Sequence, residues 1–348
     1  MARVVQWGFG AMGSGMVERM LQCGDIQIVG VIDRRPEYQG RDIGDILGLG
    51  CETGITVSND ATKVLREQKP DLTLLATGSF IDEVTPVLTT IMESGSNAIT
   101  IAEELAYPWR LYPEKSKRLD EIAKKNGVTL LGTGVNPGFV LDTLILLLTG
   151  CCSRIDKITA TRINDLSPFG PTVMQSQGVG LKVDEFNEGL ERGTIVGHIG
   201  FQESIAMIAD ALGWKLDEIV EKREPIVAIR PREGKFIKVK PGMVAGCRHL
   251  GYGMMNGKAV IELVHPQQIQ PSVEDIDTGD YIKIEGTTYI NVSNNPEVPG
   301  GEGTMNVAVN MIPQVISAKP GFTSMKDLPM PISILANNGQ NEGSAQNR

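Results

Sequence analysis

Residues 3–33 read RVVQWGFGAMGSGMVERMLQCGDIQIVGVID, and this stretch decides the fold. An apolar run leads into Gly8, Gly10 and Gly13, and a second apolar run ends on Asp33, twenty residues after Gly13. This order predicts a strand, a tight turn, a helix and a second strand. The free N–H groups and the dipole at the start of such a helix attract phosphate. We therefore expect a dinucleotide site, with Gly8 in the turn, Gly10 admitting a pyrophosphate and Gly13 letting the helix pack closely.

Composition is ordinary for a globular protein of 348 residues, with 41% hydrophobic and 22% charged residues. The net charge of -9 argues against nucleic-acid binding. The five cysteines show no metal-ligand spacing, so no metal site is expected. The most apolar run, Phe139–Leu148, is too short to cross a membrane and is expected to form a buried helix. We expect a cytoplasmic protein without a signal peptide.

The first part of the chain alternates short apolar runs with helical patterns, which is typical of a doubly wound parallel sheet. Strands are expected at Val4–Gly8, Ile28–Asp33, Leu72–Thr77, Asn97–Ile101 and Thr129–Gly132. Helices are expected at Gly13–Cys23, Thr62–Lys69, Thr85–Ser94 and Pro113–Asn126. Asp82 is the expected N-cap of the third helix.

From about residue 150 the pattern becomes rich in β-strands. Strands are expected at Lys157–Asn164, Ile226–Arg230, Lys235–Lys240, Met243–Met254, Ala259–His265, Tyr281–Glu285 and Thr288–Val292. Asn256-Gly257 predicts a hairpin turn. Helices are expected at Val183–Arg192, His198–Leu212 and Thr304–Ile316, and a loop at Ser167–Gly180.

The predicted fold class is α/β: a Rossmann doubly wound parallel sheet followed by an α+β domain with a mixed or antiparallel sheet. The predicted parts are a dinucleotide-binding domain at 1–145 and a substrate-binding and oligomerisation domain at 146–303. A segment at 304–335 is expected to pack back on the first domain. A polar tail is expected at 336–348.

The end of the second strand gives mixed signals about the cofactor. A carboxylate such as Asp33 can hold the ribose hydroxyls of NAD, whereas an arginine such as Arg34 or Arg35 can bind the 2′-phosphate of NADP. We expect both cofactors to be used, without ranking them.

Polar residues follow three further strand ends, where a doubly wound sheet binds its ligands. Thr77-Gly78-Ser79 is expected along the second ribose, and Ala102-Glu103-Glu104 beside the nicotinamide, where at most one of the two carboxylates need face the ring. Asn136 is expected to open a helix beside the nicotinamide. Together with the glycine turn, the predicted cofactor-binding residues are Gly8, Gly10, Ala11, Met12, Gly13, Asp33, Arg34, Thr77, Gly78, Ser79, Ala102, Glu103 and Asn136.

In the second domain, Arg162 and Asn164 share one face of a strand by alternation. An arginine on that face can hold a carboxylate with two hydrogen bonds. Of the three histidines, His198 and His265 are candidates to line a pocket, and His249 is expected to be structural.

Several motifs in this order resemble the 2,4-diaminopentanoate dehydrogenase family and the wider group of native amine dehydrogenases. The stretches that carry the resemblance are 7–15 (WGFGAMGSG), 102–108 (AEELAYP), 131–138 (LGTGVNPG), 166–171 (LSPFGP), 197–201 (GHIGF), 265–269 (HPQQI) and 278–281 (TGDY). They span the chain to about residue 330.

The resemblance implies an NAD(P)-dependent oxidative deamination within ornithine degradation, in which 2,4-diaminopentanoate becomes 2-amino-4-oxopentanoate and ammonia. The family uses an active-site glutamate, and Glu104 is the position that matches it best. Arg162 is then the candidate for the substrate carboxylate, with Asn164, His198 and His265 shaping the pocket. A homodimer is also expected.

Two other interpretations stay open from the sequence. The same architecture serves dihydrodipicolinate reductase and meso-diaminopimelate dehydrogenase, which act on other substrates. A nicotinamide-binding sensor without chemistry would keep the glycine motif but would not need Glu104.

Overall fold

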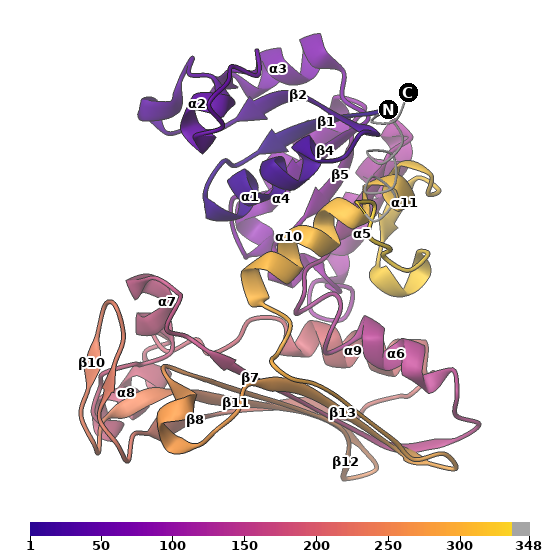
Figure 1. The fold of residues 1–348 in the computed structure, drawn as a ribbon. Coiled ribbons are helices and arrows are strands. Elements are labelled where there is room, and N and C mark those ends of the chain that lie inside the picture. The colour runs from indigo at the N-terminus through magenta and orange to yellow at the C-terminus, as the bar shows by residue number, and fades with distance from the viewer. Residues whose placement is uncertain (336–348) are drawn as a thin grey trace, which may run out of the picture. The chain divides into compact units, whose positions relative to one another are not determined.

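The computed structural model describes residues 1–335, so the predicted polar tail at 336–348 lies outside the described residues (Figure 1). The chain divides into two units. Unit 1 comprises Met1–Phe139 and the chain from Gly300 onward, and unit 2 comprises Val140–Pro299. The C-terminal segment therefore belongs to the same unit as the N-terminal strand.

Unit 1 is built on a parallel seven-stranded sheet in the order β15-β6-β5-β4-β1-β2-β3. The strands are β1 (Ala2–Trp7), β2 (Ile26–Ile32), β3 (Val57–Ser58), β4 (Leu72–Leu75), β5 (Asn97–Thr100), β6 (Thr129–Gly132) and β15 (Gly321–Thr323). The chain reverses its direction across the sheet at β1, since β2 and β4 lie on its two sides. Such a reversal opens a crevice at the carboxyl ends of the strands.

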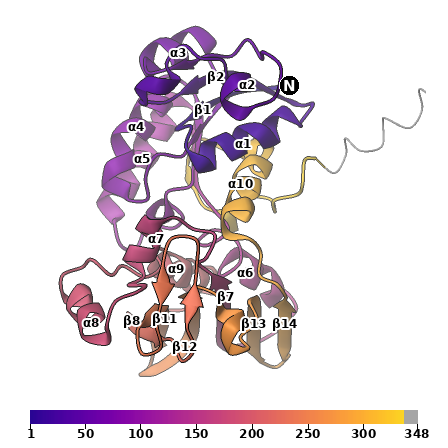
Figure 2. The same cartoon turned by 60° about the vertical axis from the view of Figure 1, so that its left-hand side comes forward.

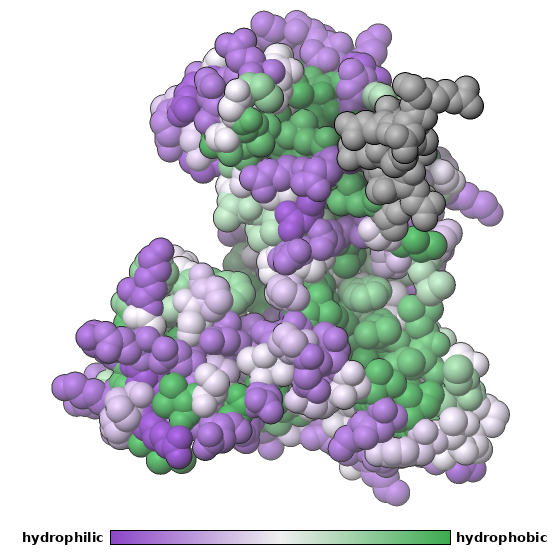
Figure 3. Space-filling model, in the orientation of Figure 1, coloured by the Kyte–Doolittle hydropathy of each residue, from purple (hydrophilic) through white to green (hydrophobic). Residues whose placement is uncertain are grey.

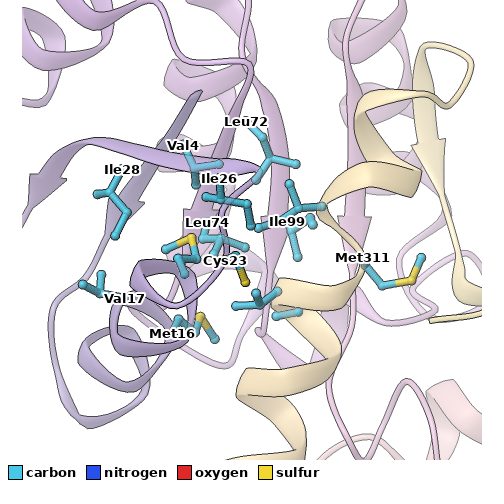
Figure 4. Close-up of a cluster of buried hydrophobic side chains, with 14 of the residues drawn as sticks. Val4, Met16, Val17, Cys23, Ile26, Ile28, Leu72, Leu74, Ile99 and Met311 are labelled. Atoms are coloured by element: carbon cyan, nitrogen blue, oxygen red, sulfur yellow. The ribbon is translucent and has the colours of Figure 1, made fainter. Parts of the chain in front are cut away.

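Helices cover both faces of this sheet. They are α1 (Ala11–Leu21), α2 (Ile43–Leu47), α3 (Ala61–Gln68), α4 (Ile81–Glu93), α5 (Pro113–Asn126), α10 (Gly300–Asn310) and α11 (Ile312–Ile316). One core joins Val4, Met16 and Met311, and contains residues of α1, α10 and α11 (Figure 4). The other joins Val5 with Leu88 and Leu119 of α4 and α5. Neighbouring residues of β1 thus point into opposite cores, which confirms the doubly wound sheet.

The C-terminal segment belongs to unit 1 and adds a strand that the sequence did not predict. Its strand β15 pairs with β6 and becomes the edge of the sheet. Its helix α10 lies beside α1 in both views (Figures 1 and 2). The two helices are in close contact at Gly15 of α1, where a Cβ atom would lie 2.2 Å from the sulfur of Met305 in α10.

The predicted cap of the third helix was wrong. Helix α4 begins at Ile81, after Phe80 as N-cap, and Asp82 lies inside the first turn. The Ile81 N–H donates instead to the Glu104 carboxylate, at 2.7 Å. The Glu104 side chain, 23 residues from Ile81 in sequence, therefore accepts a free N–H of the helix start in place of Asp82.

Unit 2 contains a mixed six-stranded sheet in the order β14-β13-β7-β12-β11-β8. The strands are β7 (Ile155–Asp165), β8 (Glu218–Val227), β11 (Val244–Met255), β12 (Lys258–Gln268), β13 (Gly279–Gly286) and β14 (Ile290–Asn294). Only the β7–β12 pair is parallel within this described sheet. Asn256 and Gly257 form the β11–β12 turn with positive φ angles of 52° and 70°, as predicted.

Unit 2 also differs from the sequence prediction in several places. Its helices are α6 (Thr143–Thr149), α7 (Pro171–Ser176), α8 (Val183–Glu191) and α9 (Phe201–Ala211). Helix α7 lies inside the predicted loop Ser167–Gly180, and His198 precedes α9 rather than starting it. The predicted strand Lys235–Lys240 is half of a small hairpin, β9 (Arg232–Glu233) with β10 (Lys238–Val239).

The apolar run around α6 is less buried than predicted. Helix α6 begins only at Thr143, and Leu147 is 42% exposed. Hydrophobic surface is visible over this helix, whereas the surface around α2 and α3 is mostly hydrophilic (Figure 3). Within residues 1–335 no helix has both the length and the apolar character that a bilayer crossing requires.

We predict that Gly13→Ala will destabilise the protein by about 3 kcal/mol, because overpacking against backbone cannot relax through a side chain. A Cβ at Gly13 would lie 1.8 Å from the Gly8 carbonyl oxygen. Gly24→Ala is the matched control, since no heavy atom lies within 4 Å of its Cβ position. Urea unfolding measures both variants, and an equal effect of the two would contradict the packing described for Gly13.

Candidate functional site

The turn from β1 into α1 requires glycine at two positions. Gly8 has a φ of +90°, and its N–H donates to the Ile32 carbonyl at 2.8 Å. A Cβ on Gly8 would lie 2.4 Å from the Ala76 carbonyl oxygen, and one on Gly13 would meet the carbonyl of Gly8 itself. Backbone therefore crowds both positions, which matches the roles predicted for them.

The start of α1 is open where a phosphate is expected. Gly10 is the N-cap, and no heavy atom lies within 4 Å of the position that its Cβ would occupy. The N–H groups of the first turn, on Ala11, Met12 and Gly13, have no partner in the preceding turn of a helix. This is the arrangement that binds anions at helix N-termini.

A cavity of about 530 Å³ lies next to this turn, at the carboxyl ends of β1, β2 and β4. It brings together five predicted cofactor residues, Gly8, Gly10, Asp33, Arg34 and Thr77. Its remaining lining is Trp7, Arg35, Ala76, Glu83 and Val87. Sequence reasoning did not select Glu83, which sits in the first turn of α4 like any solvated helix residue.

Asp33 is held tightly at the end of β2. Its carboxylate accepts the N–H of Phe9 at 2.6 Å, and the Arg35 guanidinium binds both of its oxygens at 2.9 Å. Burial raises the pKa of Asp33, but the hydrogen bonds from Arg35 and Phe9 outweigh burial and lower it to about 2. Asp33 is thus ionised and paired rather than free.

The two carboxylates that follow β5 lie in different surroundings. Glu103 is partly buried and accepts a hydrogen bond from the Ser79 side chain. Burial raises the pKa of Glu103 above the usual range of a glutamate, and the charge of Glu104 adds to the rise. A carboxyl group with a raised pKa is suited to proton transfer near neutral pH.

Glu104 uses both carboxylate oxygens inside unit 1. One oxygen accepts the Ile81 N–H at 2.7 Å, and the other accepts the Tyr112 hydroxyl at 2.8 Å. Its own N–H donates to the Ser79 carbonyl. Glu104 therefore joins the starts of α4 and α5 to the loop at Ser79, and both of its carboxylate oxygens already accept hydrogen bonds.

The other predicted cofactor residues, Gly78, Ala102 and Asn136, follow neighbouring strand ends. The Ala102 N–H donates to Thr100, and Gly78 lies against the Glu83 side chain. Both polar atoms of the Asn136 side chain are buried without a hydrogen-bond partner among the described residues. Such an amide is available to a ligand that offers both a donor and an acceptor, as a carboxamide does.

Arg162 lies on the buried face of β7, as the alternation predicted. Its guanidinium forms a buried ion pair with Asp280 at 2.5 Å and also donates to the Val298 carbonyl. These contacts use two of its five N–H groups. A substrate carboxylate would therefore have to bind through the remaining N–H donors of Arg162. Asp280 already neutralises the positive charge of Arg162, so this charge would attract the carboxylate less.

The predicted pocket histidines of unit 2 gather around Phe201. The rings of His198 and His265 meet edge to face at 4.8 Å, and His265 bonds Asn164 at 2.8 Å. One ring nitrogen of each histidine is buried without a partner in the described chain. Burial lowers the pKa of both histidines well below the usual value, so both are neutral at pH 7.

His249 is structural, in line with the sequence interpretation. Its Nδ1 accepts the His198 N–H at 3.0 Å, so its Nε2 carries the proton that lies 2.6 Å from Glu221. Glu221 was missed because β8 begins eight residues before the predicted strand at Ile226. Over residues 1–335, no group of three or more His, Cys, Asp and Glu side chains is arranged to hold a metal ion.

Two family models match the chain. The model described as the 2,4-diaminopentanoate dehydrogenase C-terminal domain matches residues 139–343, more than half of the sequence. The model for the N-terminus of dihydrodipicolinate reductase matches residues 2–85. The chain belongs to the 2,4-diaminopentanoate dehydrogenase family.

Individual relatives agree with this assignment. A 2,4-diaminopentanoate dehydrogenase from Acetoanaerobium sticklandii is 44% identical over 96% of this chain and 95% of its own. An amine dehydrogenase from Streptomyces virginiae is 27% identical over 95% of this chain and 97% of its own. The solved amine dehydrogenase from Mycobacterium smegmatis has a TM-score of 0.84 at 32% identity and covers 95% of this chain and 97% of its own. The chain is thus a dehydrogenase with a Rossmann domain and a mixed-sheet domain, which confirms the predicted family and fold class.

We predict that Asp280→Ala will destabilise the protein by about 3 kcal/mol or more, because it leaves the buried Arg162 charge unpaired. Asp156→Ala on the same sheet is the control, since Asp156 is 56% exposed and its pair with Arg154 is a surface one, for which about 0.5 kcal/mol is expected. Urea unfolding compares the two, and a small effect of Asp280→Ala would mean that Arg162 does not depend on this partner.

Proposed function

We propose that this protein catalyses the NAD(P)-dependent oxidative deamination of 2,4-diaminopentanoate to 2-amino-4-oxopentanoate and ammonia. The observation that carries the proposal is the 44% identity, over nearly the full length of both chains, to a protein with that name. The glycine turn and the carboxyl pair at the end of β5 supply what a hydride-transfer site needs from unit 1.

The residues at the strand ends of unit 1 fit a nicotinamide dinucleotide. The free N–H groups of α1 suit its pyrophosphate, and the unpartnered Asn136 amide suits its carboxamide. When bound, this cofactor supplies the hydride acceptor. The contribution of the protein is then to hold the substrate amine and to move protons.

We assign the proton-transfer role to Glu103. It takes one proton from the substrate ammonium and passes it to solvent, and the free amine releases its C4 hydride and becomes an iminium ion, which the regenerated carboxylate stabilises. Water then adds to the iminium carbon while the carboxylate accepts one of its protons. The carboxyl group gives that proton to the amine nitrogen, the carbon–nitrogen bond breaks, and the hydroxyl proton leaves with ammonia as ammonium, which gives the ketone. Glu104 positions the Ser79 loop and the start of α4 around this group.

In unit 2 we assign the amino acid portion of the substrate to Arg162, Asn164, His198 and His265. The neutral histidines offer buried nitrogen atoms without partners, and Arg162 keeps unused donors. Use of both NAD and NADP, a homodimer, a cytoplasmic location and a place in ornithine degradation stay predictions.

A second candidate is the oxidation of a simpler amine on the same fold. Two relatives are named amine dehydrogenases, and Asp280 already balances the charge of Arg162, which weakens the case for a substrate carboxylate. The dihydrodipicolinate reductase family model matches residues 2–85, whereas the 2,4-diaminopentanoate dehydrogenase model matches residues 139–343. The carboxyl pair argues against a sensor without chemistry.

The purified protein is expected to reduce NAD+ or NADP+ with 2,4-diaminopentanoate and to release one ammonia for each cofactor reduced. The panel includes simple aliphatic amines, lysine and meso-diaminopimelate. Faster turnover of an aliphatic amine would favour the second candidate. If the protein binds the cofactor but turns over no amine, a nicotinamide-binding sensor without chemistry would be the remaining interpretation.

Glu103→Gln is expected to lower kcat by about a thousandfold, the usual contribution of general acid–base catalysis. Glu104→Gln is the matched variant: it is expected to keep much more activity but to lower the melting temperature, because it weakens a hydrogen bond to the start of α4. The reverse ranking of the two kcat values would return the proton-transfer role to Glu104.

The pH profile offers a separate check on Glu103. Amine oxidation requires its carboxylate, so kcat/KM should fall as the pH drops through the raised pKa of Glu103. The Ser79 hydrogen bond lowers that pKa, so Ser79→Ala should move the acidic limb to higher pH. If the acidic limb does not move in Ser79→Ala, or if it is still present in Glu103→Gln, then a titratable group other than Glu103 produces it.

A further inference from the structure

The Asp33 carboxylate has no free acceptor position in this structure. One oxygen accepts the Arg35 backbone N–H and the Arg35 Nε, both at 2.9 Å. The other accepts the Phe9 N–H at 2.6 Å and the Arg35 Nη2 at 2.9 Å. A carboxylate offers about four such positions. A ribose hydroxyl would therefore have to displace one of these donors before Asp33 could bind it.

Tyr38 fixes the guanidinium that binds Asp33. The Cζ of Arg35 lies 4.0 Å from the centroid of the Tyr38 ring, and its Nη1 lies 3.2 Å from the Tyr38 hydroxyl. The Tyr38 ring in turn packs edge to face on Phe9 at 6.1 Å. Because Phe9 also donates to Asp33, these four residues form a closed set of contacts, of which Asp33 and Arg35 line the cavity.

Arg34 supplies the cationic side chain at this end of the cavity. Asp33 and Arg35 cancel each other, whereas the exposed Arg34 side chain has no hydrogen bond or ion pair within the described part of the chain. The other carboxylates nearby are Glu37, which is exposed beside Arg35, and Glu83, which belongs to α4 and lines the cavity with Thr77. Glu37 belongs to the short helical turn Pro36–Tyr38 and Glu83 to α4, and within residues 1–335 neither forms an ion pair with Arg34.

We propose that Arg35 determines cofactor specificity by occupying Asp33, which removes a ligand for the NAD ribose and a repulsive charge against the NADP 2′-phosphate. Tyr38 is its positioning residue, and Arg34 is the arginine that faces the phosphate. The protein then binds NADP+ more tightly than NAD+. This inference rests on the proposed function only in that the cavity holds a nicotinamide dinucleotide.

Calorimetric titration with NAD+ and with NADP+, without any amine, tests this directly. The wild-type protein should bind NADP+ more tightly. Arg35→Ala should lower the ratio of NADP+ to NAD+ affinity by about thirtyfold or more, the size expected when an unpaired carboxylate faces an anion. Asp33→Asn combined with Arg35→Ala should restore most of the ratio, because the repulsive charge is then gone. Arg41→Ala, an exposed arginine outside the cavity lining, should leave the ratio unchanged.

Each other outcome overturns the inference. An unchanged ratio in Arg35→Ala would show that Asp33 is not masked. A fall that the double variant does not restore would mean that Arg35 contacts the phosphate itself. If Arg35→Ala does not fold, Tyr38→Leu carries the test and should lower the ratio in the same direction, so that an unchanged ratio there contradicts the positioning role. Failure of the wild-type protein to bind either dinucleotide would remove the proposed function as well.

Discussion

Unit 1 depends on the close approach of the Gly8 carbonyl to Gly13. Any side chain at Gly13 would lie 1.8 Å from that oxygen, so the contact is possible only between glycine and backbone. It turns β1 directly into α1 and leaves the first-turn N–H groups facing open space beside Gly10. The carboxyl ends of β2 and β4 then supply Asp33, Arg34 and Thr77 to the same cavity. The open start of α1 thus follows from a packing constraint at two glycines, Gly8 and Gly13.

In both units, local patterns predicted the elements that carry their own short-range signal. The apolar strands and the Asn256-Gly257 turn are short-range features, and the structure confirms them. Features that depend on distant residues were missed. Strand β15 is only three residues long and exists by pairing with β6, and the start of α4 is set by Glu104 rather than by the nearby Asp82. The residues near β15 and near the start of α4 give no indication that β6 and Glu104 are their partners.

The candidate site shows the same division. Sequence position placed Glu103 and Glu104 at the end of β5, but adjacent side chains point in different directions and the pattern could not predict the hydrogen bonds of each one. The Ile81 N–H and the Tyr112 hydroxyl donate to the two carboxylate oxygens of Glu104, whereas burial raises the pKa of Glu103. Likewise, alternation placed Arg162 on the buried face of β7, yet its pairing with Asp280 joins strands 118 residues apart in sequence. Residue type and strand position were therefore predictable, and hydrogen-bond partners were not.

The central claim is that the protein moves a hydride from the carbon that bears the amine to a nicotinamide held at the start of α1. Substrate carrying deuterium at C4 of 2,4-diaminopentanoate tests it most directly. The account predicts that one deuterium atom appears at C4 of the nicotinamide ring for each ammonia released, together with a primary isotope effect whenever hydride transfer limits the rate. Ammonia release with deuterium lost to water, and none on the reduced cofactor, would contradict it.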